Sequence, residues 1–255
     1  MPNTNSRVRL IFTALSSLIF TVKCPSCGRD GCNDFADFGI CERCRELLTT
    51  DIIQVNRGSV KVFAGSKYSP TMSRLILAAK ENNQIHARKF LATCLLRSLT
   101  VAIKGFSKNP KSQNCEIILI PIPSRREADR ARGFAHVELL LKLLMRDSHI
   151  ANLKALNCLQ HAKKIVDQST LNFHERELNM LGAFEINPRF NNEIARIKRI
   201  QNGITPDQLF KTLVFLVDDL VTTGTTVQAA NKALCSLGLR VDGALASCAT
   251  DGFTH

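Results

Sequence analysis

Val214-Phe-Leu-Val-Asp-Asp-Leu-Val-Thr-Thr-Gly-Thr-Thr226 is the stretch that decides the fold, because it passes from apolar residues to acids and then to small polar residues. The five apolar residues at 213–217 indicate a buried strand. From Thr225 to Leu237, apolar residues recur at helical spacing, and Gly238 then provides a stop. The segment therefore predicts a strand, a turn and a helix in direct succession.

The same alternation of strand and helix extends to both sides of this segment. Strand-like runs lie at 58–68, 117–120, 155–159 and 241–247, helical patterns lie at 71–80, 84–104, 134–145 and 169–180, and a polar surface loop is expected at 105–114. Such alternation is typical of a parallel sheet with crossover helices. We therefore expect an α/β domain over residues 51–255, a parallel sheet flanked by helices.

The polar half of the segment predicts a ligand site. Asp218-Asp219 follow the strand at the carboxyl edge of the sheet, where open α/β folds bind ligands. Gly224, the neighbouring threonine hydroxyls and the start of the next helix would form a cradle for a phosphate monoester. The two carboxylates cannot bind that phosphate, so vicinal ribose hydroxyls or a hydrated Mg²⁺ are their natural partners. The alternative is that the threonines only cap the helix and the aspartates only form a turn at the strand end. A single cap needs one such residue, whereas seven of the nine residues from 218 to 226 are polar or glycine.

Composition narrows the class of protein without identifying a partner. Hydrophobic residues make up 45% of the 255-residue chain, which is enough for a sizeable core and argues against global disorder. The formal net charge of +12 favours anionic partners such as nucleic acid, polyphosphate substrates or a membrane surface. A basic surface that serves only solubility is the alternative.

Four cysteines have the spacing of a structural zinc site. Cys24-x-x-Cys27 and Cys41-x-x-Cys44 are separated by thirteen residues, as for two knuckles around one tetrahedral ion. Cys32 lies between the pairs and is either a spectator or a replacement ligand. Two disulfides are the alternative, but the other cysteines are scattered singly through apolar stretches, which favours a reducing compartment and a cytoplasmic location.

The N-terminal residues 1–23 contain an apolar run from Leu10 to Val22 behind two arginines, which is the outline of a signal peptide. Lys23 and a cysteine pair stand where a cleavage site would be, and the run is too short to span a membrane. We expect a helix docked on the core, with a peripheral membrane contact left open. The expected organisation is this helix at 1–23, a zinc module at 24–50 and the α/β domain at 51–255.

The 214–226 segment closely resembles the phosphoribosyl-pyrophosphate (PRPP) motif of type I phosphoribosyltransferases. The matching residues are Val214, Val217, Asp218, Asp219, Thr223, Gly224 and Thr226. This resemblance implies that Asp218 and Asp219 contact the ribose hydroxyls. The 5′-phosphate would be held by Thr222, Thr223, Gly224, Thr225 and Thr226, and Mg²⁺ would accompany the PRPP.

The order of motifs resembles the ComF family of competence-related proteins. A zinc knuckle comes first and the PRPP motif last, with Pro121-Ile-Pro-Ser-Arg-Arg126 and Ala131-Arg-Gly-Phe134 between them. Further matches are Tyr68, Lys80, Gln168-Ser-x-Leu171, Arg176, Asn179 and Gly182-Ala-Phe184. The chain departs from the family pattern at Ala135-His136, where Asn-Gln is usual, and in the basic segment 187–211, which is longer than typical and has the look of an insertion.

The resemblance also implies a pyrophosphate site. Arg125 and Arg126 follow a predicted strand, and guanidinium groups suit pyrophosphate oxygens through bidentate contacts. They join Asp218 and Asp219 as the candidate catalytic residues. The alternative is a solvated charged loop moderated by Glu127.

ComF relatives are implicated in DNA uptake during natural transformation, so the resemblance implies single-stranded DNA and the uptake machinery as partners. The net charge and the 187–211 segment would supply phosphate contacts, although stacking platforms are scarce, with no Trp and one Tyr. The alternative is a catalytically active, salvage-type phosphoribosyltransferase without a DNA role. No segment of the sequence identifies an acceptor base.

Overall fold

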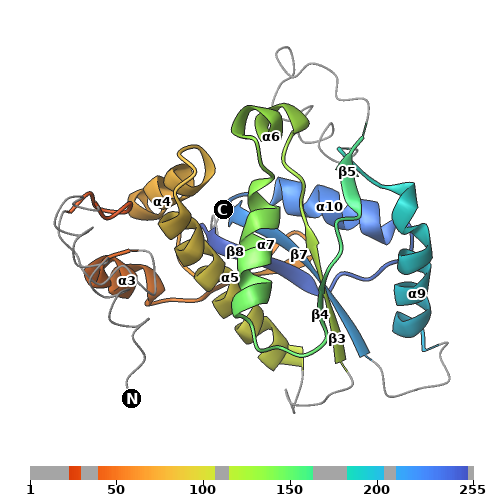
Figure 1. The fold of residues 1–255 in the computed structure, drawn as a ribbon. Helices are drawn as coiled ribbons and strands as arrows, with labels where there is room; N and C mark the ends of the chain where they lie inside the picture. Colours follow the sequence, from red (N-terminus) through yellow and green to blue (C-terminus); the bar gives the residue numbers. More distant parts are fainter. Residues whose placement is uncertain (1–22, 30–39, 107–114, 163–182, 204–210, 252–255) are drawn as a thin grey trace, which may run out of the picture.

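The computed structural model describes residues 23–29, 40–106, 115–162, 183–203 and 211–251. Its centre is a six-stranded sheet with the order β1-β2-β8-β7-β3-β4 (Figure 1). The strands are β1 (Ile53–Arg57), β2 (Val60–Ala64), β3 (Cys115–Pro121), β4 (Leu153–Ala155), β7 (Lys211–Val221) and β8 (Gly243–Ala249). β1 and β2 are antiparallel, and the other neighbouring pairs are parallel. The predicted α/β fold with a largely parallel sheet is confirmed.

Helices cover both faces of this sheet. The described helices are α3 (Glu42–Thr49), α4 (Pro70–Lys80), α5 (Ile85–Phe106), α6 (Arg126–Arg132), α7 (His136–Asp147), α9 (Asn191–Gln201) and α10 (Thr225–Cys235), with a short 3₁₀ helix, η2 (Pro188–Phe190). Buried side chains of α4, α5 and α7 form one core cluster, which includes Phe215 and Val217 of β7. Those of α9 and α10 form the second, which includes Val214 and Leu216. Successive side chains of β7 point to opposite faces of the sheet, so this one strand contributes to both core clusters.

Local sequence explains how α4 is placed. The Ser69 hydroxyl accepts a hydrogen bond from the Met72 N–H at 3.2 Å, and Pro70 occupies the first helical position. A side-chain cap and a proline in the first turn both favour a helix start at this point. The buried face of Met72, Leu75 and Ala79 then joins the first core cluster, where α4 packs against α5. Lys80 is the last residue of α4, and its Nζ lies 3.4 Å from Asp219 Oδ2 on β7.

Two segments differ from the sequence-based expectation near β4. A single strand was expected at 155–159, but β4 ends at Ala155. The Leu156 N–H still donates to the Leu119 carbonyl at 2.9 Å, and Cys158 then turns back to bond the Leu156 carbonyl. The chain leaves the main sheet at this turn. β5 (Leu159–His161) pairs instead with β6 (Phe184–Ile186) in a separate two-stranded antiparallel sheet.

Four other elements were not anticipated or were wrongly bounded. The hairpin partner β1 was missed, because only two of its five residues, Ile53 and Val55, are apolar. The helix α6 occupies the arginine-rich loop, where no helix was expected. β7 runs on to Val221, so the two acids lie within the strand instead of after it, and α5 continues through Phe106 into the expected loop. The remaining expected strands and helices of the described ranges are confirmed with small shifts of their ends.

The 187–211 segment includes more than surface loop. Its described part contains η2 and α9, and Ile194 and Ile197 of α9 are buried in the second core cluster. Arg196 of α9 also pairs with the buried Glu116 of β3 at 2.9 Å. The described part of the segment therefore packs on one face of the sheet.

Several expectations lie outside the described residues. These are the N-terminal helix at 1–23 apart from Lys23, Cys32, most of the 105–114 loop, and the 169–180 helix with Gln168, Arg176 and Asn179. The three-part division of the chain stays a prediction. Within the described ranges, none of the helices has the length and hydropathy needed to cross a membrane.

Candidate functional site

The PRPP-like segment lies at the carboxyl edge of the sheet, as predicted. β7 is flanked by the parallel strands β3 and β8, so the three carboxyl ends meet at one edge. After Val221 the chain turns through Thr222, Thr223 and Gly224, and α10 begins at Thr225. The site is therefore built on the central strand of the fold and on the first turn of the helix that follows it.

The loop before α10 has the backbone geometry of an anion cradle. Gly224 is the N-cap residue of α10 and adopts φ +80°, a left-handed conformation that favours glycine. Among the described residues, no side chain caps this helix, so its first N–H groups are available to a ligand. The side chains of Thr222 and Thr223 are exposed, and the Thr223 and Thr225 hydroxyls lie 3.0 Å apart. Backbone and hydroxyl donors thus converge on a site with partial positive charge.

The two acids of the motif are in different environments. Asp219 is 6% exposed, and its Oδ2 lies 3.4 Å from the Lys80 Nζ and 3.6 Å from the His136 Nε2. Asp218 accepts the backbone N–H of Asp219 through Oδ1 at 2.8 Å. Loss of hydration raises the pKa of Asp218 well above its ordinary value, and the neighbouring Asp219 carboxyl acts in the same direction. Asp219 therefore has internal partners, whereas Asp218 is the acid whose charge a cation or ligand would stabilise.

His136 stands at the start of α7, where the chain departs from the ComF pattern. It is fully buried, and within the described part of the chain neither ring nitrogen has a hydrogen-bond partner. Burial lowers the pKa of His136 to about 4, although the carboxylate of Asp219 acts to raise it. Lys80, on α4, approaches the same carboxylate. In the sequence, Lys80 matched the ComF pattern and His136 departed from it. Neither observation indicated that both side chains approach the Asp219 carboxylate.

The arginine-rich segment forms α6, which follows β3 at the same sheet edge (Figure 1). Arg125 is the N-cap residue and Arg126 the first helical residue, and both side chains are exposed. Arg132 is instead held inside the protein, since it pairs with Asp129 at 2.9 Å and Glu81 at 3.4 Å. The segment thus divides into exposed arginines at its start and a structural arginine at its end.

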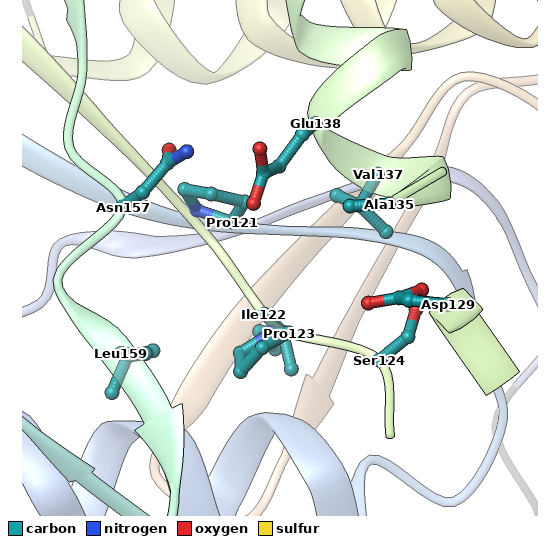
Figure 2. A pocket seen from close by; sticks show the side chains of 10 residues that line it. All are labelled: Pro121, Ile122, Pro123, Ser124, Asp129, Ala135, Val137, Glu138, Asn157 and Leu159. Atoms are coloured by element: carbon teal, nitrogen blue, oxygen red, sulfur yellow. The ribbon is translucent and has the colours of Figure 1, made fainter. Parts of the chain in front are cut away.

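A small pocket lies between the carboxyl end of β3, α6, α7 and the turn after β4 (Figure 2). Its lining residues are Pro121, Ile122, Pro123, Ser124, Asp129, Ala135, Val137, Glu138, Asn157 and Leu159. Figure 2 shows the Asp129 and Glu138 carboxylates on its α6 and α7 sides. The pocket therefore has apolar walls with a few hydrogen-bond acceptors.

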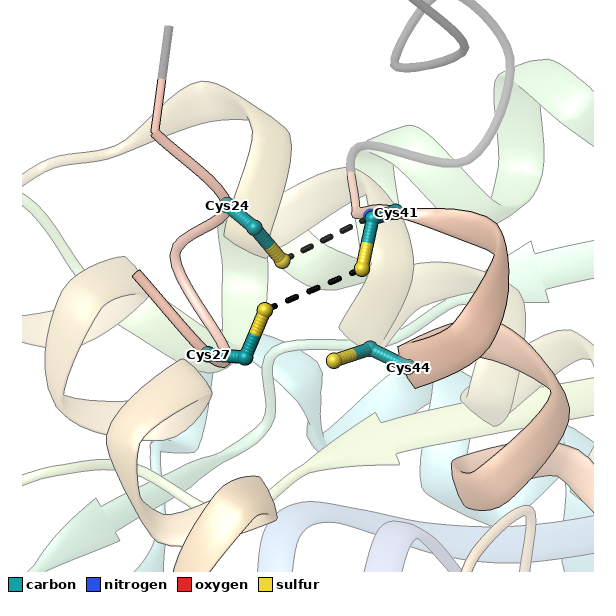
Figure 3. Close-up of side chains that lie close together, drawn as sticks. All are labelled: Cys24, Cys27, Cys41 and Cys44. Carbon is teal, nitrogen blue, oxygen red and sulfur yellow. Dashed lines mark hydrogen bonds between the residues drawn. The ribbon is translucent and has the colours of Figure 1, made fainter. Parts of the chain in front are cut away.

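The four predicted zinc ligands come together (Figure 3). Their sulfur atoms all lie within 4.8 Å of one another, and Cys27 and Cys41 are 3.8 Å apart. Two thiolates bonded to one tetrahedral zinc ion at about 2.3 Å stand about 3.8 Å apart, so the cluster fits zinc. Each of the four cysteines is a free thiol, in agreement with a metal site and against two disulfides. Such a closed site holds structure and supplies no catalytic chemistry.

The cysteine cluster is fixed locally and docked on α4. Gly28 adopts φ +73° and donates its N–H to the Cys24 carbonyl at 2.8 Å, which closes the first knuckle. Cys44 lies on α3, the short helix that carries the second pair. The Arg74 guanidinium donates to the Ser26 carbonyl at 2.8 Å. The cluster is thereby joined to the helix that also carries Lys80.

Comparison with known proteins identifies a relative. The chain is 27% identical over 172 residues to Competence protein F of Haemophilus influenzae, and the match covers 68% of this chain. The resemblance to the ComF family is confirmed. The match spans 65% of the length of Competence protein F, so the activity and partners of that whole protein are not transferred here. No protein-family model matches the chain.

Proposed function

We propose that the carboxyl edge of the sheet binds PRPP together with Mg²⁺, and that this binding serves DNA uptake. The observation that carries the proposal is the uncapped start of α10, which follows Asp218 and Asp219 on the central strand. A phosphate accepts hydrogen bonds from the loop N–H groups and threonine hydroxyls. The ribose hydroxyls and the Mg²⁺ are the partners that suit Asp218.

Charge and position support a role for the start of α6 at the pyrophosphate end. Arg125 and Arg126 are exposed there, on the segment that leaves β3 beside β7. Guanidinium groups pair with phosphate oxygens in a bidentate manner. Mg²⁺, when bound, would neutralise charge on the pyrophosphate group. The residues of this chain hold the two ends of the ligand, with Thr222–Thr226 at the 5′-phosphate and the arginines at the pyrophosphate.

The DNA part of the proposal rests on the relative and on charge. The name Competence protein F belongs to a protein that shares 27% identity with this chain. A net charge of +12 would attract single-stranded DNA through its phosphates. We propose that single-stranded DNA and the uptake machinery are the partners, with PRPP as the small-molecule ligand.

Calorimetric titration of PRPP with Mg²⁺ tests the central claim. We expect binding by the unchanged chain and loss of at least about tenfold in affinity for Asp218→Asn, since a charge-assisted contact contributes about 1.5–3 kcal/mol. Asp147→Asn is the matched control, because Asp147 is exposed at the far end of α7 and pairs with its neighbour Arg146. Equal binding by Asp218→Asn and Asp147→Asn would contradict the site assignment.

Release of pyrophosphate from PRPP separates binding from transfer. The assay combines the protein with PRPP, Mg²⁺ and each of a panel of purine and pyrimidine bases. Base-dependent release that disappears in Arg126→Gln would favour a salvage-type transferase over a PRPP-binding protein. Silence with every base, together with calorimetric binding, would favour PRPP as a ligand only.

A further inference from the structure

Arg57, the last residue of β1, lies under the phosphate loop although nothing in the sequence marks it. It is 8% exposed and follows Ile53 and Val55 on the face that packs against the second core cluster. A Cβ built on Gly224 would stand 2.4 Å from the Arg57 Cβ and 2.6 Å from its Cγ. The stem of Arg57 therefore fills the space behind the N-cap of α10, and position 224 must be glycine for this reason as well as for its positive φ.

The guanidinium of Arg57 joins two ends of the site. Its Nη2 donates to the Thr250 carbonyl at 2.8 Å and to the Thr250 hydroxyl at 3.0 Å. The Thr250 hydroxyl donates in turn to the Thr222 carbonyl at 3.3 Å, and the Thr250 N–H donates to the Val221 carbonyl at 3.1 Å. One arginine thereby connects the hairpin β1–β2, the end of β8 and the first residue of the loop.

The surroundings of the Arg57 charge bear on what the site binds. Within the part of the chain that the structure describes, no Asp or Glu forms an ion pair with it, and its buried Nε has no hydrogen-bond partner. A buried cation without a counter-charge is costly, and such groups are normally paired. The neighbouring feature that attracts an anion is the start of α10, which is itself uncapped. Two independent features, a helix start and a buried cation, thus point to an anion at the same place.

We propose that Arg57 is a buried counter-charge of the phosphate cradle and makes the loop prefer the dianionic form of a phosphate monoester. The inference rests on the proposed function, because it concerns the same loop. It goes further in naming the charge state of the ligand and a residue from a different part of the chain. Its positive charge would attract the phosphate, and its hydrogen bonds to Thr250 would fix Thr222 in the loop. Arg57 is therefore a positioning residue.

Ribose 5-phosphate is the probe, since it carries a single phosphate whose second proton leaves near pH 6. We would measure its affinity at pH 5.5 and pH 7.5 for the unchanged chain, Arg57→Met and Arg57→Lys. The unchanged chain should bind up to about fourfold more tightly at pH 7.5 than at pH 5.5, because a fixed cation interacts more strongly with the dianion, which is about a quarter of the ligand at pH 5.5 and nearly all of it at pH 7.5. Arg57→Met should bind about tenfold more weakly at pH 7.5 and lose most of the pH dependence. Asp218 is present in all three proteins, so any pH dependence that it contributes is shared and the difference between them reports Arg57.

The second variant and a control separate charge from structure. Arg57→Lys keeps the charge and loses the fork geometry, so it should retain the pH dependence with weaker affinity. Arg146→Met removes an exposed cation at the far end of α7 and should change neither quantity. An Arg57→Met chain that binds like the unchanged chain, or that loses affinity equally at both pH values, would overturn the inference. Failure of the unchanged chain to bind either ribose 5-phosphate or PRPP would instead overturn the proposed function, and this inference with it.

Discussion

At the scale of single residues, the site depends on side chains that approach β7 from other elements. Lys80 arrives from α4, His136 from α7 and Arg57 from β1. The first two face the Asp219 carboxylate, and the third lies behind Gly224. The acids and the glycine of the motif therefore have buried neighbours whose charge and volume would affect the ligand binding that we propose for them.

Gly224→Ala should be far more damaging than the same change at another glycine with positive φ. Gly133 adopts φ +78° with nothing within 4 Å of an added Cβ, whereas a Cβ at Gly224 would overlap Arg57. We expect Gly133→Ala to lower the free energy of unfolding by about 1 kcal/mol through backbone strain alone. Gly224→Ala should lose about 3 kcal/mol or more and should also lose PRPP binding, because the stem of Arg57 must move. Urea unfolding and calorimetry test this, and equal losses for the two variants would contradict it.

His136 should make the protein less stable in acid. Its pKa is lowered to about 4 in the folded chain, against about 6.5 when unfolded, so the unfolded chain binds more protons between these values. The free energy of unfolding should therefore rise with pH from about 4 to about 6.5 and stay constant above, with a total change of up to about 3 kcal/mol from this group. His136→Gln should flatten this rise, and the exposed His149→Gln should leave it unchanged. Urea unfolding across this pH range gives the answer, and equal slopes in the two variants would refute the role of His136.

At the scale of elements, the cysteine cluster and α4 form a continuous unit. Ser26 of the first knuckle bonds Arg74 on α4, and the C-terminal residue of the same helix pairs with Asp219. Metal binding at the cysteines therefore constrains a helix that reaches the ligand site. The module is remote from the loop in sequence, yet one helix connects them.

Removal of zinc should be measurable as a loss of stability. We expect one zinc ion per chain by elemental analysis, retained in Cys235→Ala, since Cys235 is exposed on α10, and lost in Cys44→Ala. Burial raises the pKa of Cys44, so zinc must displace its proton, and the ion should be released as pH falls. A chelator should lower the melting temperature of the unchanged chain but not that of Cys44→Ala. Zinc content that is the same in both variants would count against the cluster as the metal site.

At the scale of the whole molecule, the charge distribution is the feature that bears on a nucleic-acid partner. The chain carries 34 Lys and Arg against 22 Asp and Glu. Some of this charge is neutralised inside the fold, as with Arg196 and Lys154 on Glu116, but the arginines at the start of α6 are exposed. The exposed arginines are the ones that can contact phosphates.

Binding of single-stranded DNA should therefore weaken with salt in a graded way. Arg130 of α6 is exposed like Arg126. Removal of one phosphate-binding arginine should reduce the slope of log affinity against log salt by about 0.7, so Arg126→Gln with Arg130→Gln should reduce it by about 1.4. Fluorescence anisotropy of a labelled oligothymidine measures this, with Arg146→Gln as the control. Asp218→Asn should leave DNA affinity unchanged if the two ligands use different surfaces. Affinity that does not depend on salt would contradict a phosphate-based interface.

The sequence alone was sufficient for the features that depend on neighbouring residues. The strand, loop and helix of 213–226 and the knuckles at Cys24–Cys27 and Cys41–Cys44 follow from periodicity, glycine geometry and ligand spacing, which act over a few residues. Tertiary structure alone decided which distant side chains reach the site. The strand order places β2 beside β8 and the hairpin strand β1 next to α10, so Arg57 meets Gly224, while packing of α4 and α7 on one face brings Lys80 and His136 to Asp219. The approach of these side chains depends on which strands pair and which helices pack together across long distances in the sequence. The pattern of neighbouring residues does not determine either.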